Sequence, residues 1–196
     1  DNMDGLAAGL ATVASGFFFM LAFAEGLGLV AMLAAATLGA SIGFLYYNFN
    51  PASLFMGDAG SLLLGYVLAV LGIKLEFAAQ TRAATWIIPI AILGVPIFDT
   101  TLVVISRLRR GKHPYQGGKD HTSHRLVSIL GMTHARAVMS LYMVAGTLGL
   151  IAILLRDVPL PVARLILAGL SITFVGALIW LEARFEEEPP PGPLSD

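Results

Sequence analysis

The sequence contains no cysteine and little charge. Only 13% of its 196 residues are Asp, Glu, Lys or Arg. The lack of cysteine excludes disulfides and thiol chemistry. A net charge of −1 gives no indication of nucleic-acid binding, so no nucleic-acid partner is expected. So few charges cannot cover a soluble domain of this size, and 57% hydrophobic residues with a mean hydropathy of +0.80 place the chain in a lipid bilayer.

Six apolar runs stand out, most of them near the ~20 residues that cross the hydrocarbon core. They are residues 5–24, 27–47, 61–79, 85–106, 137–155 and 161–181. Small residues recur within them, which is typical of helices that pack against one another. We therefore predict an all-α fold, a polytopic transmembrane helical bundle with about six spans over residues 1–185. Residues 186–196, EEEPPPGPLSD, predict a disordered acidic and proline-rich tail.

The basic residues predict how the chain is oriented. Seven of the twelve Lys and Arg residues lie between the fourth and fifth runs, in residues 107–136. The positive-inside rule places that segment in the cytoplasm. Counting crossings back from it puts the N-terminus and residues 48–58 on the same side. Three polar stretches therefore share the cytoplasmic face of the inner (plasma) membrane.

The first polar stretch is Asp1-Asn2-Met3-Asp4-Gly5. Two carboxylates three residues apart lie on one side of a helical turn. Asp4 could equally cap the following helix, and Asp1 could be a solvated residue at the chain end. The stretch alone leaves these interpretations open.

The second stretch runs from Asn48 to Ser61 and contains Phe55 and Asp58. Pro51 and Gly57 end one helix, and Asp58 is predicted at the N-cap of the next. A carboxylate there can hold a hard cation, while the helix N-terminus faces phosphate oxygens. Asp58 could also be only a cap. Phe55 fits an interface anchor or an exposed ring on which a base stacks.

The third stretch is the basic loop, which ends in His121-Thr-Ser-His124-Arg125. Two imidazoles beside a guanidinium form a plausible cradle for a diphosphate. A zinc site would need further ligands, and no cysteine supplies one. The alternative is a loop that sets the topology and meets anionic lipid.

Asp99 lies inside the fourth apolar run, about two turns from Arg107. An ionisable group at that depth is costly, so it should face the bundle interior or a polar cavity. The sequence leaves open whether it takes part in a site or bonds locally to neighbouring helices.

These stretches together resemble a known superfamily. FMGDAGSLLLG (residues 55–65), preceded by Asn48, resembles the signature of the polyprenyl-phosphate N-acetylhexosamine-1-phosphate transferases, glycosyltransferase family 4. The superfamily includes phospho-N-acetylmuramoyl-pentapeptide transferase. DNMDGLAAG resembles the end of its N…DG(I/L)DGLA motif, with Asn2 in place of a glycine. HTSHRL resembles its histidine motif, with Ser123 in place of a third histidine.

The resemblance implies a Mg²⁺-dependent enzyme, with Mn²⁺ as an alternative ion. A polyprenyl phosphate would attack the β-phosphate of a UDP-N-acetylhexosamine, giving a polyprenyl-diphospho-sugar and UMP. It implies Asp58 and Asp1 as metal ligands and catalytic residues. The other residues with implied roles are His121, His124 and Arg125 at the phosphates, Asp4 and Asn48 at the uridine, and Phe55 stacked on uracil.

The resemblance also implies more chain than is present. The superfamily has an upstream half with an aspartate pair in an earlier cytoplasmic loop. We therefore expect this chain to be the C-terminal part of an enzyme about twice as long, inactive by itself, with a homodimer left open. The basic loop favours the N-acetylhexosamine branch over the muramoyl-pentapeptide branch.

Two alternatives belong to other classes of protein. A multi-span transporter or channel should place ionisable groups near the bilayer midplane. Here only Asp99 lies well inside a run, which favours the transferase. A purely structural membrane subunit explains neither the FMGD string nor the polar stretches on one face.

Overall fold

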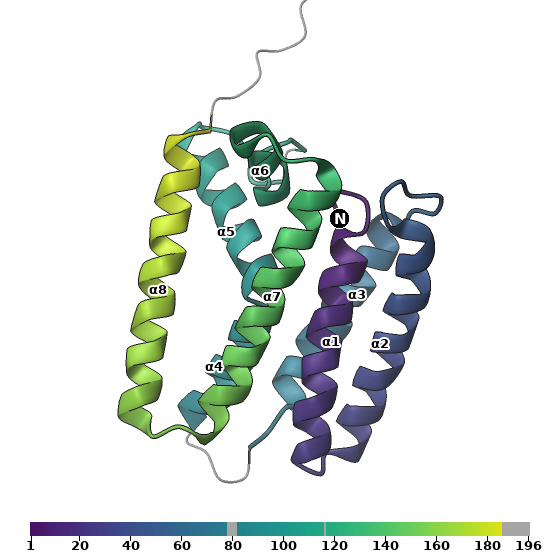
Figure 1. Cartoon of the computed structure of the whole chain (residues 1–196), viewed down its shortest axis with the longest axis vertical. Coiled ribbons are helices and arrows are strands. Elements are labelled where there is room, and N and C mark those ends of the chain that lie inside the picture. The colour runs from purple at the N-terminus through teal and green to yellow at the C-terminus, as the bar shows by residue number, and fades with distance from the viewer. Residues whose placement is uncertain (78–81, 116, 186–196) are drawn as a thin grey trace, which may run out of the picture.

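The computed structural model describes residues 1–77, 82–115 and 117–185, and all of its regular elements are α-helices. Figure 1 shows them as a bundle of long helices with one short helix at one end. In chain order they are α1 (Leu6–Ala24), α2 (Gly28–Asn48), α3 (Gly57–Lys74), α4 (Arg82–Ile92), α5 (Gly94–Arg109), α6 (Thr122–Leu130), α7 (His134–Asp157) and α8 (Leu160–Ala183). The predicted tail lies outside the described residues.

Five of these helices are long and apolar enough to cross a membrane, namely α1, α2, α3, α7 and α8. The pair α4 and α5 makes a sixth span if the two are counted together. The chain is therefore a multi-span membrane protein with an all-α fold, as the sequence predicts. The third span begins at Gly57, earlier than predicted, because the Asp58 carboxylate is favourable in the first turn of a helix.

The fourth apolar run is not one straight span, as its composition predicts, but two helices bent by 76°. The break falls at Leu93, between α4 and α5. Pro96 lacks the N–H that would bond to the Ile92 carbonyl, and its ring would clash with that carbonyl in a continuous helix. Pro96 fits the first turn of α5, where helical N–H groups have no partner in any case. Pro96 thus helps to convert one apolar run into a broken span.

The packing of α1 on α7 depends on two glycines. A Cβ atom on Gly9 of α1 would lie 1.9 Å from the ring of Tyr142 on α7, and one on Gly149 of α7 would lie 2.1 Å from Phe17 of α1. Each aromatic ring therefore occupies the space that a missing side chain leaves on the facing helix. The buried core beside this contact gathers side chains from α1, α2, α3, α4 and α7 and includes Phe18 and Leu71.

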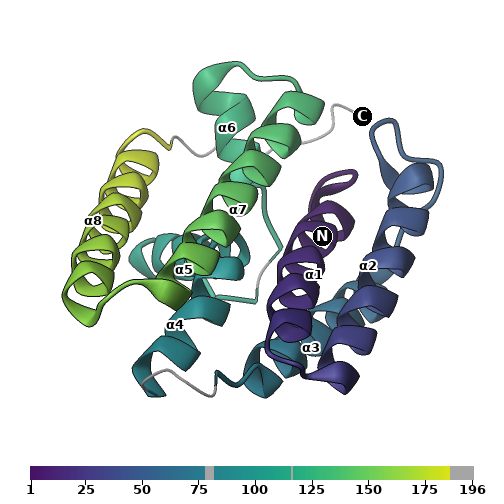
Figure 2. The ribbon, with the colours of Figure 1, turned by 60° about the horizontal axis from the view of Figure 1, so that its bottom comes forward.

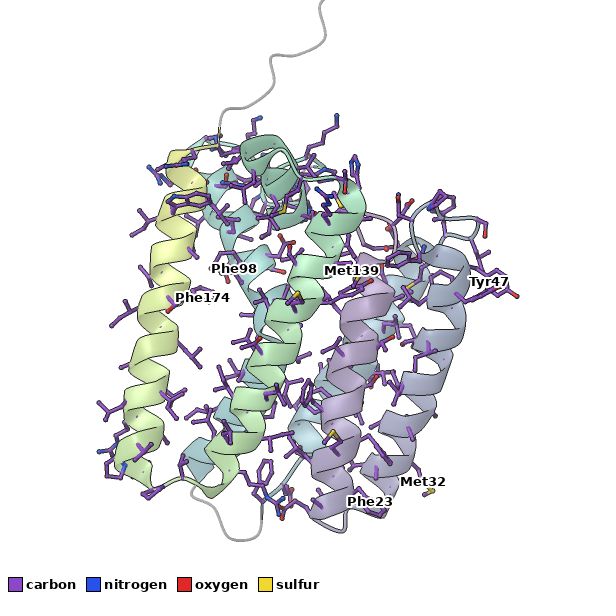
Figure 3. The ribbon with its side chains drawn as sticks, viewed as in Figure 1. Phe23, Met32, Tyr47, Phe98, Met139 and Phe174 are labelled. Atoms are coloured by element: carbon purple, nitrogen blue, oxygen red, sulfur yellow. The ribbon has the colours of Figure 1, made fainter. Side chains whose placement is uncertain are left out.

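The helix α8 stands beside α5 at the edge of the bundle, as the two views of the ribbon show (Figures 1 and 2). Phe98 of α5 and Phe174 of α8 meet edge to face, with 4.9 Å between ring centroids (Figure 3). Most other apolar side chains of α8 are exposed, as expected of a helix that faces lipid.

The three polar stretches lie at the same end of the bundle. In Figure 1 the N-terminus, the loop between α2 and α3, and α6 are all at the top. At the opposite end, Arg156 of α7 forms an ion pair of 2.8 Å with Glu25, which follows α1. The separation of the two ends agrees with the count of membrane crossings.

Helix α6, which the sequence reading treats as loop, is held in place by Arg125. This residue is fully buried, and its guanidinium donates to Glu182 at the end of α8 (2.8 Å), to the Ser106 hydroxyl (2.6 Å) and to the Asp120 carbonyl (2.7 Å). The Phe185 ring lies 4.1 Å from the guanidinium carbon. Arg125 therefore joins α6 to both α5 and α8.

Breaking the Arg125–Glu182 pair should destabilise the protein. Glu182→Leu leaves a buried guanidinium without its counter-charge, and we expect the free energy of unfolding to fall by about 3–5 kcal/mol. Adding Arg125→Met to that variant should restore much of the loss that comes from Arg125, since two apolar side chains then pack together. The part that comes from Arg110, whose Nη2 also donates to Glu182 at 3.0 Å, remains lost. Chemical unfolding in detergent micelles measures both. A double variant less stable than either single one would contradict this account.

Candidate functional site

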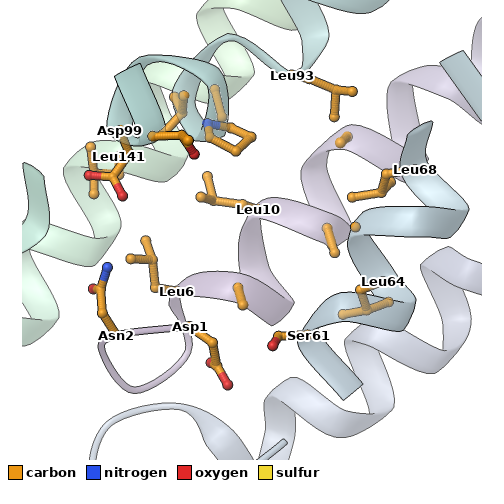
Figure 4. Close-up of a pocket in the computed structure, with 18 of the residues that line it drawn as sticks. Asp1, Asn2, Leu6, Leu10, Ser61, Leu64, Leu68, Leu93, Asp99 and Leu141 are labelled. Carbon is orange, nitrogen blue, oxygen red and sulfur yellow. The ribbon is translucent and has the colours of Figure 1, made fainter. Parts of the chain in front are cut away.

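A cavity of about 270 Å³ opens among α1, α3, α5 and α7 at the polar end of the bundle. Its polar lining comprises Asp1, Asn2, Ser61, Thr100, Asp99, His121 and Thr122. The rest of its wall is apolar and includes Leu10, Leu64, Leu68 and Leu93. Figure 4 shows Asp1, Asn2 and Ser61 toward one end and Leu68 and Leu93 toward the other. The cavity thus joins a polar mouth to an apolar interior between the helices.

Asp99 is bonded at that mouth to the beginning of α6. Its Oδ2 lies 2.7 Å from His121 Nδ1, and its Oδ1 accepts the Thr122 N–H at 2.6 Å. The two contacts fix the orientation of the imidazole and leave Nε2 as the ring nitrogen that can face another group. The sequence alone leaves the role of Asp99 open. The sequence feature that indicates a role for Asp99 is the presence of an ionisable residue within an apolar run.

His124 lies in the first turn of α6, three residues beyond His121, which is the N-cap of that helix. Burial lowers the pKa of the His124 ring below its ordinary value, and the nearby His121 lowers it further. A hydrogen bond to the backbone of Asn2 acts in the opposite direction. The net lowering means that His124 is mainly neutral at pH 7, and a neutral imidazole can accept a hydrogen bond or a proton.

Arg125, predicted to contact a phosphate, has its guanidinium occupied within the protein, as described above. Arg107 behaves similarly, because its Nε and Nη2 each donate to the Asp120 carboxylate at 2.7 Å. Burial raises the pKa of Asp120, but the hydrogen bonds from Arg107 and from the Asp120 backbone, together with the nearby charge of Arg107, outweigh it, and the net shift is downward. Both arginines therefore fix the basic loop and α6 to the bundle.

The first two polar stretches are joined through Asn48 and Asp4. Asn48 is buried, accepts the Gly5 N–H at 3.0 Å and donates to the Leu54 carbonyl at 2.9 Å. Asp4 Oδ2 accepts from the Ala52 N–H and from the Asn50 side chain, both at 3.1 Å. In this structure the two residues predicted at the uridine hold the α2–α3 loop against the start of α1.

Asp58 and Phe55 are exposed beside this junction. Asp58 lies in the first turn of α3 and not at its N-cap, which is Met56; the prediction of an N-cap was wrong by two residues. The cause is Gly57, whose φ of +68° lets the chain turn directly into the helix. Asp58 is not among the residues that line the cavity, but Ser61, one turn further along, is.

No three His, Asp or Glu side chains converge to enclose a metal ion within residues 1–77, 82–115 and 117–185. The predicted ligands Asp1 and Asp58 are both exposed carboxylates. Mg²⁺ is often held by one or two carboxylates together with water and substrate phosphates. The chemistry of two exposed carboxylates at the polar end therefore fits Mg²⁺ held jointly with a phosphate.

Comparison with known proteins adds to this geometry. Residues 1–76 match the family model described as glycosyl transferase family 4. The chain is 38% identical over 157 residues to a probable undecaprenyl-phosphate N-acetylglucosaminyl 1-phosphate transferase of Bacillus subtilis (80% of this chain, 43% of the relative). It is 34% identical over 174 residues to a decaprenyl-phosphate N-acetylglucosaminephosphotransferase of Mycolicibacterium smegmatis (74% and 40%).

A third relative is a phospho-N-acetylmuramoyl-pentapeptide-transferase of Halalkalibacterium halodurans, 36% identical over 159 residues (80% of this chain, 46% of the relative). The chain spans less than half the length of each of these curated relatives.

The bonds of Asp99 should control the stability of the beginning of α6. Asp99→Ala removes the acceptor of the Thr122 N–H, and a hydrogen bond to a charged group contributes about 1.5–3 kcal/mol. We expect the Thr122 amide to exchange its hydrogen roughly 10- to 150-fold faster. Thr101→Ala is the matched control, because the Thr101 hydroxyl bonds only within α5. Equal exchange at Thr122 in both variants would count against the role of Asp99.

Proposed function

Because the chain belongs to glycosyl transferase family 4, the superfamily of the polyprenyl-phosphate N-acetylhexosamine-1-phosphate transferases, we propose that it supplies part of the active site of such an enzyme. The reaction is attack of a polyprenyl phosphate oxygen on the β-phosphorus of a UDP-N-acetylhexosamine. The bond between that phosphorus and the UMP oxygen breaks, and UMP leaves. The product is a polyprenyl-diphospho-sugar.

The observation that carries this proposal is the cavity with a polar mouth and an apolar interior. A polyprenyl phosphate has a charged head and a long apolar tail. The mouth at Asp1, Asn2 and His121 suits the phosphate end of the reaction, and the wall at Leu10, Leu68 and their neighbours suits the first prenyl units. The opening lies at one end of the bundle, where a lipid head group meets water.

Asp1 and Asp58 are the residues that would hold Mg²⁺, or Mn²⁺ in its place. The ion would neutralise part of the charge on the phosphates. Phosphoryl transfer needs mainly positioning and charge compensation. A phosphate monoester is already ionised at pH 7, so the reaction does not require a strong base. Asp1 can therefore act either as a ligand of the metal ion or as a residue that positions the lipid phosphate.

The imidazoles of α6 supply hydrogen bonds to the phosphates. His121 is oriented by Asp99 and lines the cavity. His124 is mainly neutral, as its lowered pKa implies. Arg125 contributes by holding α6 in place. In this arrangement the hydrogen bonds to the substrate phosphates come from the imidazoles rather than from that guanidinium.

The geometry favours a transferase over a transporter. The ionisable residue inside the fourth span, Asp99, is bonded to His121 and Thr122 at the polar end of the bundle. A transporter would use such a group near the bilayer midplane. If the basic residues lie on the cytoplasmic side, as the positive-inside rule requires, the polar end of the bundle lies at the cytoplasmic face of the inner (plasma) membrane.

Asp58→Asn in the full-length protein tests the metal role. We expect Mg²⁺-dependent release of UMP to fall about 100-fold or more, because several kcal/mol of charge compensation are lost. Ser53→Ala, in the same loop, is the control, since the Ser53 hydroxyl bonds only to the Tyr47 carbonyl. UMP release near the normal rate from a folded Asp58→Asn protein would remove Asp58 from the metal site.

Phe55→Ala tests the stacking of the nucleotide base. The Phe55 side chain is 72% exposed beside the polar end, so it is accessible to a base. A stacked base contributes about 1–3 kcal/mol, and we expect the UDP-sugar to bind roughly 5- to 150-fold more weakly, with lipid binding little changed. Leu54→Ala, the exposed neighbour, should bind the nucleotide normally. Equal effects of the two substitutions would show that Phe55 is only an interface anchor.

A further inference from the structure

Two side chains that are 121 residues apart in the sequence meet at the mouth of the cavity. The Ser123 hydroxyl on α6 donates to Asn2 Oδ1 at 2.6 Å. Ser123 is 1% exposed, and Asn2 is half-buried and lines the cavity. The bond therefore lies in a largely desolvated position, where a lost partner is not easily replaced by water.

The neighbours of these two residues give the contact its importance. Asn2 follows Asp1, the proposed ligand at the lipid phosphate. Ser123 lies between His121 and His124 in the sequence. The Asn2 side chain thus bonds to α6 directly beside the residue that carries the His124 ring.

The contact also joins elements that are anchored separately. The start of α1 is held to the α2–α3 loop through Asn48, and α6 is held to α5 and α8 through Arg125. Met3 and Leu6 at the start of α1 also share an apolar cluster with Leu126 and Val127 of α6. The hydrogen bond from Ser123 to Asn2 adds a directional contact beside the N-terminal carboxylates and the imidazoles.

We propose that Asn2 and Ser123 form a pair of positioning residues that fixes Asp1 relative to His121 and His124. The proposal rests on the proposed function, because the separation matters only if both groups act on one substrate. A glycine at position 2 would supply no side chain to accept from the Ser123 hydroxyl.

A double-mutant cycle in the full-length protein measures the coupling. Asn2→Leu and Ser123→Ala should each lower kcat about tenfold, with the KM for UDP-sugar changed less than about twofold. The reason is that misplaced reacting groups raise the barrier more than they weaken binding. The double variant should be about tenfold slower than the wild-type protein, not about a hundredfold, because both substitutions remove the same bond. Asn2→Asp, which keeps an acceptor oxygen, should recover most of the rate.

Cross-linking tests the contact without relying on activity. The chain has no cysteine, so Asn2→Cys with Ser123→Cys can be introduced into a cysteine-free full-length protein and treated in membranes with dibromobimane. We expect efficient cross-linking within the chain. The matched control pairs Asn2→Cys with Ser128→Cys, on the same helix but about 140° around its axis, and should cross-link poorly.

The outcomes are distinct. If the losses in kcat from the two single variants multiply in the double variant, or if the two cysteine pairs cross-link equally, the positioning role of Asn2 and Ser123 is wrong. The proposed function is unaffected as long as the wild-type protein carries out transfer. Absence of transfer by the wild-type protein would overturn the proposed function and the positioning role with it. Preferential cross-linking together with a non-multiplicative cycle supports the pair.

Discussion

The contact between Asp99 and the beginning of α6 is the interaction on which the polar end of this protein depends. A carboxylate within a membrane-spanning helix is costly unless it has partners. Asp99 finds them in His121 and in the Thr122 N–H, at 2.7 and 2.6 Å. His121 is the N-cap of α6 and Thr122 is its first residue, so the bonds of one half-buried carboxylate hold α6 at the mouth of the cavity.

The arginines complete that attachment from the other side. Arg125 and Arg107 bond to Glu182 and Asp120, which ties α6 and the basic loop to the ends of α8 and α5. Part of the positive charge in this region is therefore structural. A charge-rich loop can thus have several roles, each carried by different residues. Some of its charges orient the chain in the membrane, some hold the loop and α6 to the bundle, and some lie at the candidate functional site.

The broken fourth span gives the cavity its shape. Ile92, Leu93 and Pro96, which surround the break, all line the cavity. A straight helix through these residues would keep its backbone bonds internal. The 76° bend turns α5 away from α4 and leaves room between α1, α3 and α7. The break at Pro96 thus contributes to a space that is open to an amphiphilic molecule.

The sequence by itself determined the all-α bundle, the number of spans and the gathering of three polar stretches at one end, because these follow from hydrophobic length and from crossings counted along the chain. It marked Asp99 as costly but did not identify its partner. It assigned Arg125, Asn48 and Asp4 by motif, whereas the structure shows their hydrogen bonds within the protein. The bend at Leu93 and the Asn2–Ser123 contact were decided only by tertiary structure. The physical reason is that hydropathy is a sum over neighbouring residues, whereas a hydrogen bond depends on directions and distances between residues that the fold alone brings together.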